Sequence, residues 1–291
     1  MHSLESATCA NASTVGRVFL VGCPRSGTTL VQSVLAAHRE VITFQESHFF
    51  DKGFRPRAWG GYRLTPQRIA ILSQFLQENN IGSHEERTRW VDQFAALQEV
   101  PTAATWLLRL LDQQAERAGR AIWLEKTPDH VWRIPLLESI APQARFIHIV
   151  RPPLPTITSL RQATGSWGQP RSWWHCLAHW RVSLAYSARY CGAERHYFVF
   201  YDDFVTSPAE ETKRLLAWLA LPNDEDLLAR RSTETQGIVG AGEAWKGNTF
   251  GEISPRKITA RSEAPWSIRV YAASARLYDR LYRQVARQRQ G

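Results

Sequence analysis

The chain has 291 residues, of which 44% are hydrophobic, and it carries a formal net charge of +9. This length allows one large α/β domain or two small ones. Since no glycine- or serine-rich linker divides it, we predict a single domain over residues 1–291. The positive charge favours anionic ligands. Because the basic residues are dispersed, apart from residues 276–289, the charge does not predict nucleic-acid binding.

The sequence shows neither a disulfide framework nor a membrane segment. Its four cysteines are few and scattered for a chain of this length. The N-terminal segment lacks a basic region followed by an apolar one, and no apolar run is long enough to cross a bilayer. We therefore expect a cytoplasmic protein without a membrane span, and the sequence predicts no particular oligomeric state.

The first predicted element is a strand, a turn and a helix within residues 18–37. Four apolar residues end at Gly22 and predict a buried parallel strand, and apolar residues then recur at helical spacing. The turn supplies the unpaired N–H groups and positive dipole of a helix N-terminus, which together bind phosphate or sulfate. The candidate ligands in this loop are Arg25, Ser26, Gly27, Thr28 and Thr29.

The loop differs from a nucleotide-triphosphate P-loop at one position. Its spacing is G-x-x-x-x-G-T-T, with Thr28 where the P-loop has the lysine that reaches the β and γ phosphates. Arg25 inside the loop suits a shorter diester or anhydride. On this motif alone a P-loop small-molecule kinase, a non-catalytic nucleotide-binding module and a glycine turn without a ligand remain alternatives.

The next region predicts a short strand followed by a long, mostly helical crossover. Glu46 and His48 lie just past that strand, near the sheet edge that holds the phosphate loop; a surface carboxylate and a partly buried histidine are the alternatives. Residues from about 50 to 120 exceed what a crossover needs, so we predict a helical insertion that helps form an acceptor pocket. After a turn-rich, basic stretch, helices are predicted at residues 67–78, 87–98 and 102–118.

Two later apolar runs also end in candidate site residues. Residues 121–124 lead into Lys126, and the predicted strand at 145–150 leads into Arg151, with Ser159 in the following helix. Since ligands of open α/β sheets lie at the carboxyl ends of strands, Arg151 and Ser159 can meet a second phosphate. An arginine paired with a surface carboxylate and a serine facing solvent are the alternatives.

The remaining polar candidates lie in the last third of the chain. His175 and His179 have the spacing of a metal pair on a helix, but no third ligand accompanies them, so we predict no metal. Tyr201 follows a strand-like run and is either a site residue or a core aromatic.

The motifs taken in chain order resemble a known family. PRSGTTL at residues 24–30 and VRPPLPTITSLR at 150–161 resemble the two cofactor motifs of sulfotransferases that use 3′-phosphoadenosine 5′-phosphosulfate (PAPS). EKTP at 125–128 and YDDF at 201–204 resemble elements of the Golgi-type and tyrosylprotein sulfotransferases and their soluble bacterial-type relatives. The chain departs from the family at Pro152, where an acidic residue is usual.

This resemblance implies an α/β, three-layer, P-loop-like fold with a central parallel sheet flanked by helices and a helical insertion over the acceptor site. It implies that the first loop holds the 5′-phosphosulfate, that Arg151 and Ser159 hold the 3′-phosphate, and that Tyr201 lies near the cofactor. A C-terminal loop and helix, at about 240–291, are expected to cover the nucleotide with Lys246, Asn248 and Thr249.

The implied reaction is in-line transfer of the sulfuryl group to an acceptor hydroxyl on a carbohydrate, a peptide tyrosine or a small metabolite. The product 3′,5′-bisphosphoadenosine (PAP) leaves, and no metal is needed. Alignment with the tyrosylprotein enzymes from His38 onward puts their catalytic glutamate on Glu46, which makes it the predicted general base, with His48 as second choice. Lys126 and Arg25 are expected to stabilise charge on the transferring group.

Overall fold

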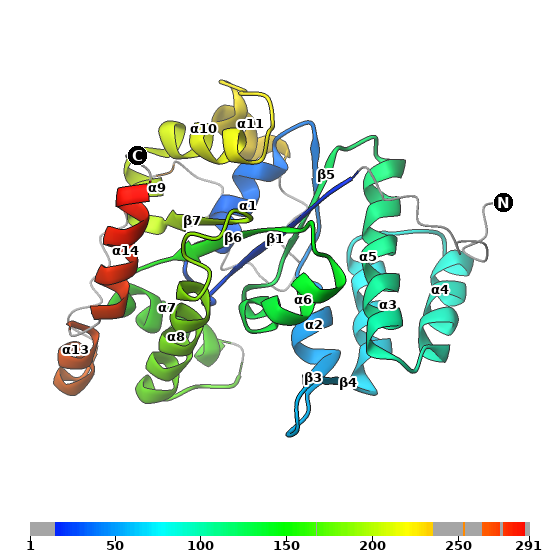
Figure 1. Cartoon of the computed structure of the whole chain (residues 1–291), viewed down its shortest axis with the longest axis horizontal. Coiled ribbons are helices and arrows are strands. Elements are labelled where there is room, and N and C mark those ends of the chain that lie inside the picture. The colour runs from blue at the N-terminus through cyan, green and yellow to red at the C-terminus, as the bar shows by residue number, and fades with distance from the viewer. Residues whose placement is uncertain (1–14, 167, 235–252, 254–263, 274–275, 289–291) are drawn as a thin grey trace.

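A five-stranded parallel sheet forms the centre of the protein (Figure 1). The computed structural model describes residues 15–166, 168–234, 253, 264–273 and 276–288. The strands lie in the order β2-β5-β1-β6-β7. Their bounds are β1 Gly16–Gly22, β2 Val41–Thr43, β5 Ile122–Lys126, β6 Arg145–Val150 and β7 His196–Phe200. The predicted parallel sheet is therefore confirmed.

The central strand β1 is buried on both faces, which explains its unbroken apolar sequence. Phe19 and Val21 point to one side of the sheet, and Val18 and Leu20 point to the other. Because the strands are parallel, their carboxyl ends meet at one edge, with Leu20 of β1 paired opposite Lys126 of β5. Every candidate phosphate or catalytic residue in the described chain lies at or beyond one of these strand ends.

Helices cover both faces of the sheet, as the sequence predicts. On the Leu20 side lie α1 (Thr28–Ala36), α10 (Pro208–Trp218) and α11 (Leu227–Glu234). On the Phe19 side lie the 3-10 helix η1 (Pro128–Arg133), α6 (Ile134–Ile140) and the helices of the insertion, around an aromatic core. In that core Phe19 stacks on Phe146 at 5.5 Å and meets Trp123 edge-on at 5.3 Å.

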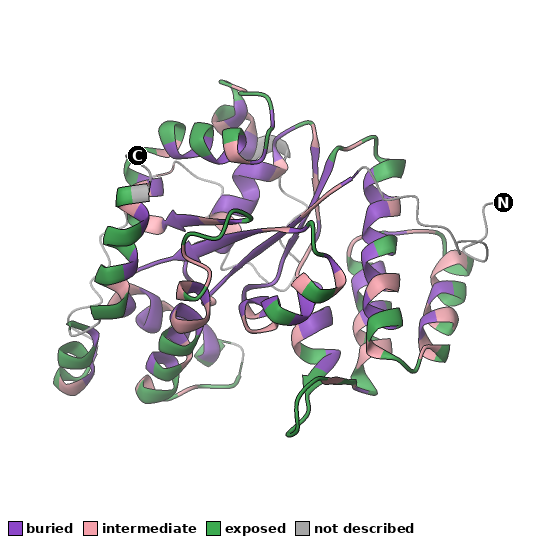
Figure 2. Ribbon diagram, viewed as in Figure 1, coloured by how far each residue is buried: buried purple, intermediate pink, exposed green. Residues whose placement is uncertain are grey.

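Four of the described helices lie beside the β6–β7 end of the sheet. They are α7 (Pro153–Ser166), α8 (Trp173–Ala188), α13 (Trp266–Ala273) and α14 (Arg276–Gln288). A short helix, α9 (Tyr201–Thr206), follows β7 directly. The sheet is almost entirely buried and the outer faces of the helices are exposed (Figure 2). Among the described helices, none is both long enough and apolar enough to span a membrane.

The region from about 50 to 120 contains a small hairpin as well as the predicted helices. Its elements are α2 (Phe49–Lys52), β3 (Phe54–Pro56), β4 (Tyr62–Leu64), α3 (Gln67–Glu78), α4 (His84–Ala96) and α5 (Val100–Arg117). Helix α4 begins three residues before the predicted start, because Ser83 and Glu86 form a capping box there. The basic stretch predicted as turns forms the β3–β4 hairpin.

Candidate active site

The loop after β1 presents an open helix N-terminus at the carboxyl edge of the sheet. The first bonds of α1 run from the N–H groups of Leu30 and Val31 to the carbonyl of Gly27, and no side chain of the described residues caps the helix. A Cβ on Gly22 would lie 2.5 Å from the carbonyl oxygen of Ile149, so only glycine lets the loop leave the sheet this close to β6. The amides at the start of α1 are thus placed to receive an anion.

Ser26 gives this loop a further polar group. Its side chain is buried, and its Oγ has no hydrogen-bond partner among the described residues. Buried hydroxyls in folded proteins nearly always have a partner, so an orphan next to an open helix N-terminus fits a ligand oxygen. Thr28 and Thr29, the first two residues of α1, add two more hydroxyl groups at the same end.

The two predicted phosphate motifs meet in space. Arg25 Nε donates to Ser159 Oγ at 3.0 Å, across 134 residues of sequence, and Arg151 Nη1 donates to the carbonyl oxygen of Arg25 at 3.1 Å. Helix α7, which carries Ser159, begins at Pro153, three residues before the predicted start near Thr156. The loop after β1 and the Arg151 turn after β6 therefore form one continuous polar surface.

Tyr201 closes one side of this surface. The guanidinium of Arg151 stacks on its ring at 4.1 Å, a cation–π geometry. A Cβ on Gly27, whose φ is +105°, would lie 2.4 Å from the ring. The ring thus packs directly on the loop after β1. The family resemblance implied that Tyr201 lies near the cofactor, and that role stays a prediction.

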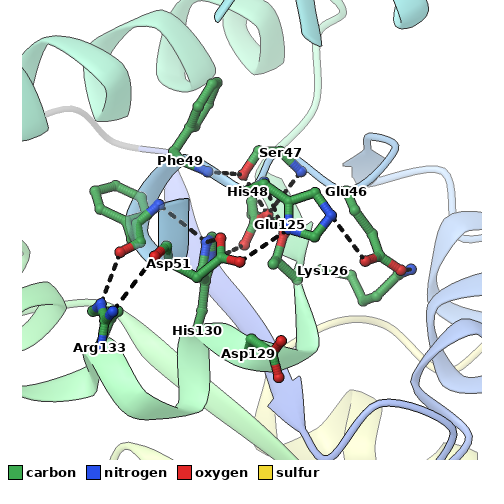
Figure 3. A network of polar contacts seen from close by, with 12 residues as sticks. Glu46, Ser47, His48, Phe49, Asp51, Glu125, Lys126, Asp129, His130 and Arg133 are labelled. Atoms are coloured by element: carbon green, nitrogen blue, oxygen red, sulfur yellow. Dashed lines mark hydrogen bonds and ion pairs between the residues drawn. The ribbon is translucent and has the colours of Figure 1, made fainter. Parts of the chain in front are cut away.

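Glu46 and Lys126 face each other at the neighbouring strand ends (Figure 3). Lys126 Nζ donates to Glu46 Oε1 at 2.5 Å; the lysine side chain is 2% exposed and the glutamate 23%. Gln32 of α1 donates to Thr43 Oγ1 at 2.9 Å and so ties α1 to β2, whose chain continues to Glu46. A buried cation and a partly open carboxylate therefore lie together beside the donor loop.

His48 lies between two carboxylates. Its Nε2 is 3.7 Å from Glu46 Oε2, and its Nδ1 is 3.1 Å from Asp51 Oδ2. Its φ is +52°, in the left-handed region that non-glycine residues seldom adopt. The hydroxyl of Thr127 accepts from the backbone N–H of His48 at 3.3 Å and helps to hold this conformation. Strained backbone of this kind concentrates at functional sites.

Behind His48 lies a fully buried acid–base pair. Glu125 Oε2 is 2.9 Å from His130 Nδ1, and Glu125 Oε1 accepts from Ser47 Oγ at 2.7 Å and Thr127 Oγ1 at 2.6 Å. Burial raises the pKa of Glu125, but the His130 charge and the bonds it receives outweigh burial and lower the pKa overall. The carboxylate is therefore ionised in the core.

His130 links this pair to Asp51. Its Nε2 lies 3.4 Å from Asp51 Oδ1 and 3.2 Å from the backbone nitrogen of Phe50. A protonated Nε2 can donate to Asp51, whereas only an unprotonated Nε2 can accept from the Phe50 N–H. Burial disfavours the imidazolium, but the carboxylates of Glu125 and Asp51 outweigh it and raise the pKa of His130 to about 9. We therefore assign the Asp51 contact to a protonated ring. Burial also opposes ionisation of Asp51, yet the two histidines lower its pKa well below the usual range.

Comparison with known proteins shows the family to which the chain belongs. A model of the sulfotransferase family matches residues 17–226, well over half of the chain. The chain belongs to the sulfotransferase family. It is 25% identical over 218 residues to a protein-tyrosine sulfotransferase of Drosophila melanogaster, and 26% identical over 217 residues to protein-tyrosine sulfotransferase 1 of Danio rerio. These matches cover 72% of this chain but only 39% and 55% of the two relatives.

Solved sulfotransferase structures share the fold. The sulfotransferase domain of the Synechococcus PCC 7002 olefin synthase matches with a TM-score of 0.64 at 21% identity, covering 94% of this chain and 97% of that domain. Mouse sulfotransferase SULT7A1, solved in complex with PAP, matches with a TM-score of 0.54 at 12% identity, covering 92% and 88%. The predicted P-loop-like α/β fold is thereby confirmed.

The candidate site contains residues that sequence reasoning did not single out. Asp51 and His130 were missed as site residues, and Glu125 was noted only as part of the EKTP motif that contains Lys126. No spacing rule joins a short helix after β2 to a 3-10 turn after β5. The available signal was that charged residues follow both β2 and β5, and that the carboxyl ends of parallel strands lie at the same edge of a sheet.

Three predicted cofactor residues have no described position. Lys246, Asn248 and Thr249 lie outside the described residues, so their covering role stays a prediction. In the part of the chain that is described, no group of three or more His, Cys, Asp or Glu side chains is placed to hold a metal ion. His179, one of the two histidines with the spacing of a metal pair, contacts Asp129, with Nε2 3.0 Å from Oδ1.

Proposed function

We propose that this sulfotransferase-family chain moves the sulfuryl group of PAPS to an acceptor hydroxyl. The observation that carries the proposal is the hydrogen bond between Arg25 and Ser159, which joins the loop for one phosphate to the motif for another. A donor with two separate phosphate groups suits this arrangement. An ATP-dependent kinase suits it less, because Thr28 occupies the position of the P-loop lysine.

The residues present fit such a donor. In the proposal, Ser26 Oγ and the amides that begin α1 bind the 5′-phosphosulfate, and Arg25 adds a fixed charge. Arg151 and Ser159 bind the 3′-phosphate, and the Tyr201 ring supports Arg151. The PAP bound to the mouse sulfotransferase of the same fold supports this choice of donor.

The proposed transfer is a direct displacement at sulfur. The acceptor oxygen forms a bond to sulfur while the bond from sulfur to the bridging oxygen breaks, and PAP leaves with that electron pair. Glu46 takes the proton of the acceptor hydroxyl. Lys126, a buried cation next to Glu46, stabilises the charge that develops on the departing oxygen.

The acceptor is proposed only as a class of hydroxyl compounds. The protein-tyrosine relatives support a peptide tyrosine, while carbohydrates and small metabolites are the other classes to screen. In the proposal the helices and hairpin of residues 50–120 shape the acceptor pocket, since they follow Glu46 directly in the chain. A cytoplasmic location stays a prediction.

The test is transfer of radiolabelled sulfur from PAPS to a panel of tyrosine peptides, carbohydrates and small phenols. We expect Glu46→Gln to lower turnover about 100-fold or more while PAP binding stays unchanged. Glu85→Gln, at an exposed position in the first turn of α4, is the matched control and keeps full turnover. Unchanged turnover in Glu46→Gln removes Glu46 from the mechanism. PAPS binding without transfer to any class favours a non-catalytic binding module.

A further inference from the structure

The buried carboxylate of Glu125 joins the two chain segments that carry the proposed base and the proposed cation. Glu125 comes one residue before Lys126 at the end of β5, and its side chain is fully buried. Ser47 comes one residue after Glu46, on the segment between β2 and α2. Ser47 Oγ lies 2.7 Å from Glu125 Oε1, across 78 residues of sequence. The two segments are therefore joined directly beside Glu46 and Lys126 (Figure 3).

The charge on Glu125 sets the direction of the hydrogen bonds around it. Burial disfavours the anion, but the charge of His130 and the hydroxyl groups near the carboxylate lower its pKa overall. An ionised carboxylate can only accept hydrogen bonds. The hydroxyl groups of Ser47, at 2.7 Å, and Thr127, at 2.6 Å, must therefore both donate to Oε1. The oxygen of each hydroxyl is then left to accept from another donor.

The backbone N–H groups of three consecutive residues use these acceptors. The N–H of Ser47 donates directly to Glu125 Oε1, at 3.4 Å. The N–H of His48 donates to Thr127 Oγ1 at 3.3 Å. The N–H of Phe49 donates to Ser47 Oγ at 3.4 Å. Each of the three amides is thus bound to the same carboxylate, either directly or through one hydroxyl group.

The backbone at the centre of this segment needs such support. His48 has a φ of +52°, in the left-handed region that non-glycine residues seldom adopt. A residue keeps such a conformation only where the surrounding contacts determine it. The chain turns here from the end of β2 into α2, so a change at His48 would redirect the segment that carries Glu46. The bonds to Glu125 and Thr127 hold this turn in place.

We propose that Glu125 is a positioning residue, whose buried carboxylate holds the turn of residues 47–49 and thereby sets Glu46 against Lys126. In this arrangement Lys126 Nζ lies 2.5 Å from Glu46 Oε1. A displacement of about 1 Å can lower the rate of a reaction about 100-fold, so a base must be held as well as present. This inference rests on the proposed function, because it concerns the placing of that same base.

Thr127 offers the sharpest change to the turn. Thr127→Val removes the hydroxyl that links the His48 N–H to Glu125 but keeps the branched shape of the side chain. Thr127→Ser keeps that hydroxyl. Ser33→Ala is the matched control, because Ser33 lies inside α1 and its buried hydroxyl also donates, to the carbonyl oxygen of Leu30 at 2.8 Å.

The first experiment measures kcat, the KM for the acceptor and the affinity for PAP. We expect Thr127→Val to lower kcat about tenfold or more, while KM and PAP affinity change less than about twofold. Thr127→Ser should restore the lost kcat, and Ser33→Ala should keep the wild-type value. An unchanged kcat in Thr127→Val overturns the proposal. A loss of PAP affinity as large as the loss of kcat also overturns it, because the variant then damages the site as a whole.

Two replacements of Glu125 test the carboxylate itself. Glutamine keeps an oxygen that can accept from Ser47 and Thr127, whereas alanine keeps none. We therefore expect Glu125→Gln to retain most of the kcat that Glu125→Ala loses. If Glu125→Gln folds, binds PAP like the wild type and yet loses as much kcat as Glu125→Ala, the hydrogen bonds to the turn are not what matters, and the proposal is overturned.

A second experiment needs no turnover and separates this proposal from the assignment of the reaction. Crystal structures of the wild type, Thr127→Val and Thr127→Ser locate the Glu46 carboxylate. We expect Glu46 to move out of hydrogen-bond distance of Lys126 in Thr127→Val and to stay within it in Thr127→Ser. Such a displacement supports the proposal even if no sulfuryl transfer is found. An unchanged contact between Glu46 and Lys126 in Thr127→Val overturns it, whatever the donor and acceptor prove to be.

Discussion

Replacing Gly27 by alanine tests how the phosphate loop is held against Tyr201. Gly27 has a φ of +105°, and an added Cβ would lie 2.4 Å from Cδ2 and 2.9 Å from Cε2 of the tyrosine ring. These separations are far below van der Waals contact, so the ring must move. Because Arg151 stacks on that ring at 4.1 Å, its displacement also disturbs the arginine proposed to bind the 3′-phosphate.

The expected cost of Gly27→Ala has two parts. Left-handed backbone strain at alanine contributes about 1–2 kcal/mol. Loss of the cation–π contact between Arg151 and Tyr201 contributes about 0.5–2 kcal/mol. Gly60→Ala is the matched control, since Gly60 has a φ of +92° but nothing within 4 Å of the added Cβ. We therefore expect Gly27→Ala to cost about 1.5–4 kcal/mol and Gly60→Ala about 1–2 kcal/mol.

Urea unfolding, followed by tryptophan fluorescence, measures both variants and a double-mutant cycle with Tyr201→Ala. In the Tyr201→Ala background the alanine Cβ at position 27 no longer clashes with the ring, so the loss of unfolding free energy caused by Gly27→Ala should fall to that of Gly60→Ala. PAP affinity should fall in Gly27→Ala and stay at the wild-type value in Gly60→Ala. A cost for Gly27→Ala that is the same with and without the Tyr201 ring would refute the account of the loop.

Two further predictions concern stability. Asp112 is buried and accepts from Arg17 Nη2 at 2.6 Å and from Trp123 Nε1 at 2.8 Å, so Asp112→Ala leaves both donors unpaired. We expect Asp112→Ala to lower the free energy of unfolding in urea by about 2–4 kcal/mol, less than for a fully buried ion pair because Arg17 is partly exposed. A decrease below about 1 kcal/mol would contradict this prediction. The pKa of His130 is raised to about 9, so its stabilising charge is complete below about pH 6.5 and is lost as pH rises through 9. The difference in unfolding free energy between wild type and His130→Asn should shrink over that interval, and a constant difference would argue against a charged ring.

The parts of the fold that the sequence predicted are those with strong local signals. The apolar run before Gly22 and the glycine-containing turn fixed the first strand, the loop and the helix, and α3 has the predicted bounds Gln67–Glu78. The contact of Arg25 with Ser159 was not predicted, because the sequence analysis placed Ser159 with Arg151 only. It agrees with the topological rule used there, since both residues lie beyond carboxyl ends of adjacent parallel strands.

The parts that were missed depend on contacts between distant segments. His130 and Asp51 meet because η1 packs against α2, and neither element carries a repeating pattern that predicts its partner. The β3–β4 hairpin was predicted only as turns, because its strands have three residues each, contain one arginine each, and β3 ends in a proline. Helix starts at Pro153 and His84 depended on proline and capping chemistry rather than on apolar spacing.

The most direct test of the central claim is isothermal titration of the protein with PAP and with 5′-AMP at the same salt concentration. The account predicts tighter binding of PAP, and it predicts that Arg151→Ala weakens PAP binding by about 1.5–3 kcal/mol, or about 10- to 150-fold, while 5′-AMP binding stays the same. Equal affinity of the wild-type protein for the two nucleotides would contradict the assignment of Arg151 and Ser159 to a 3′-phosphate.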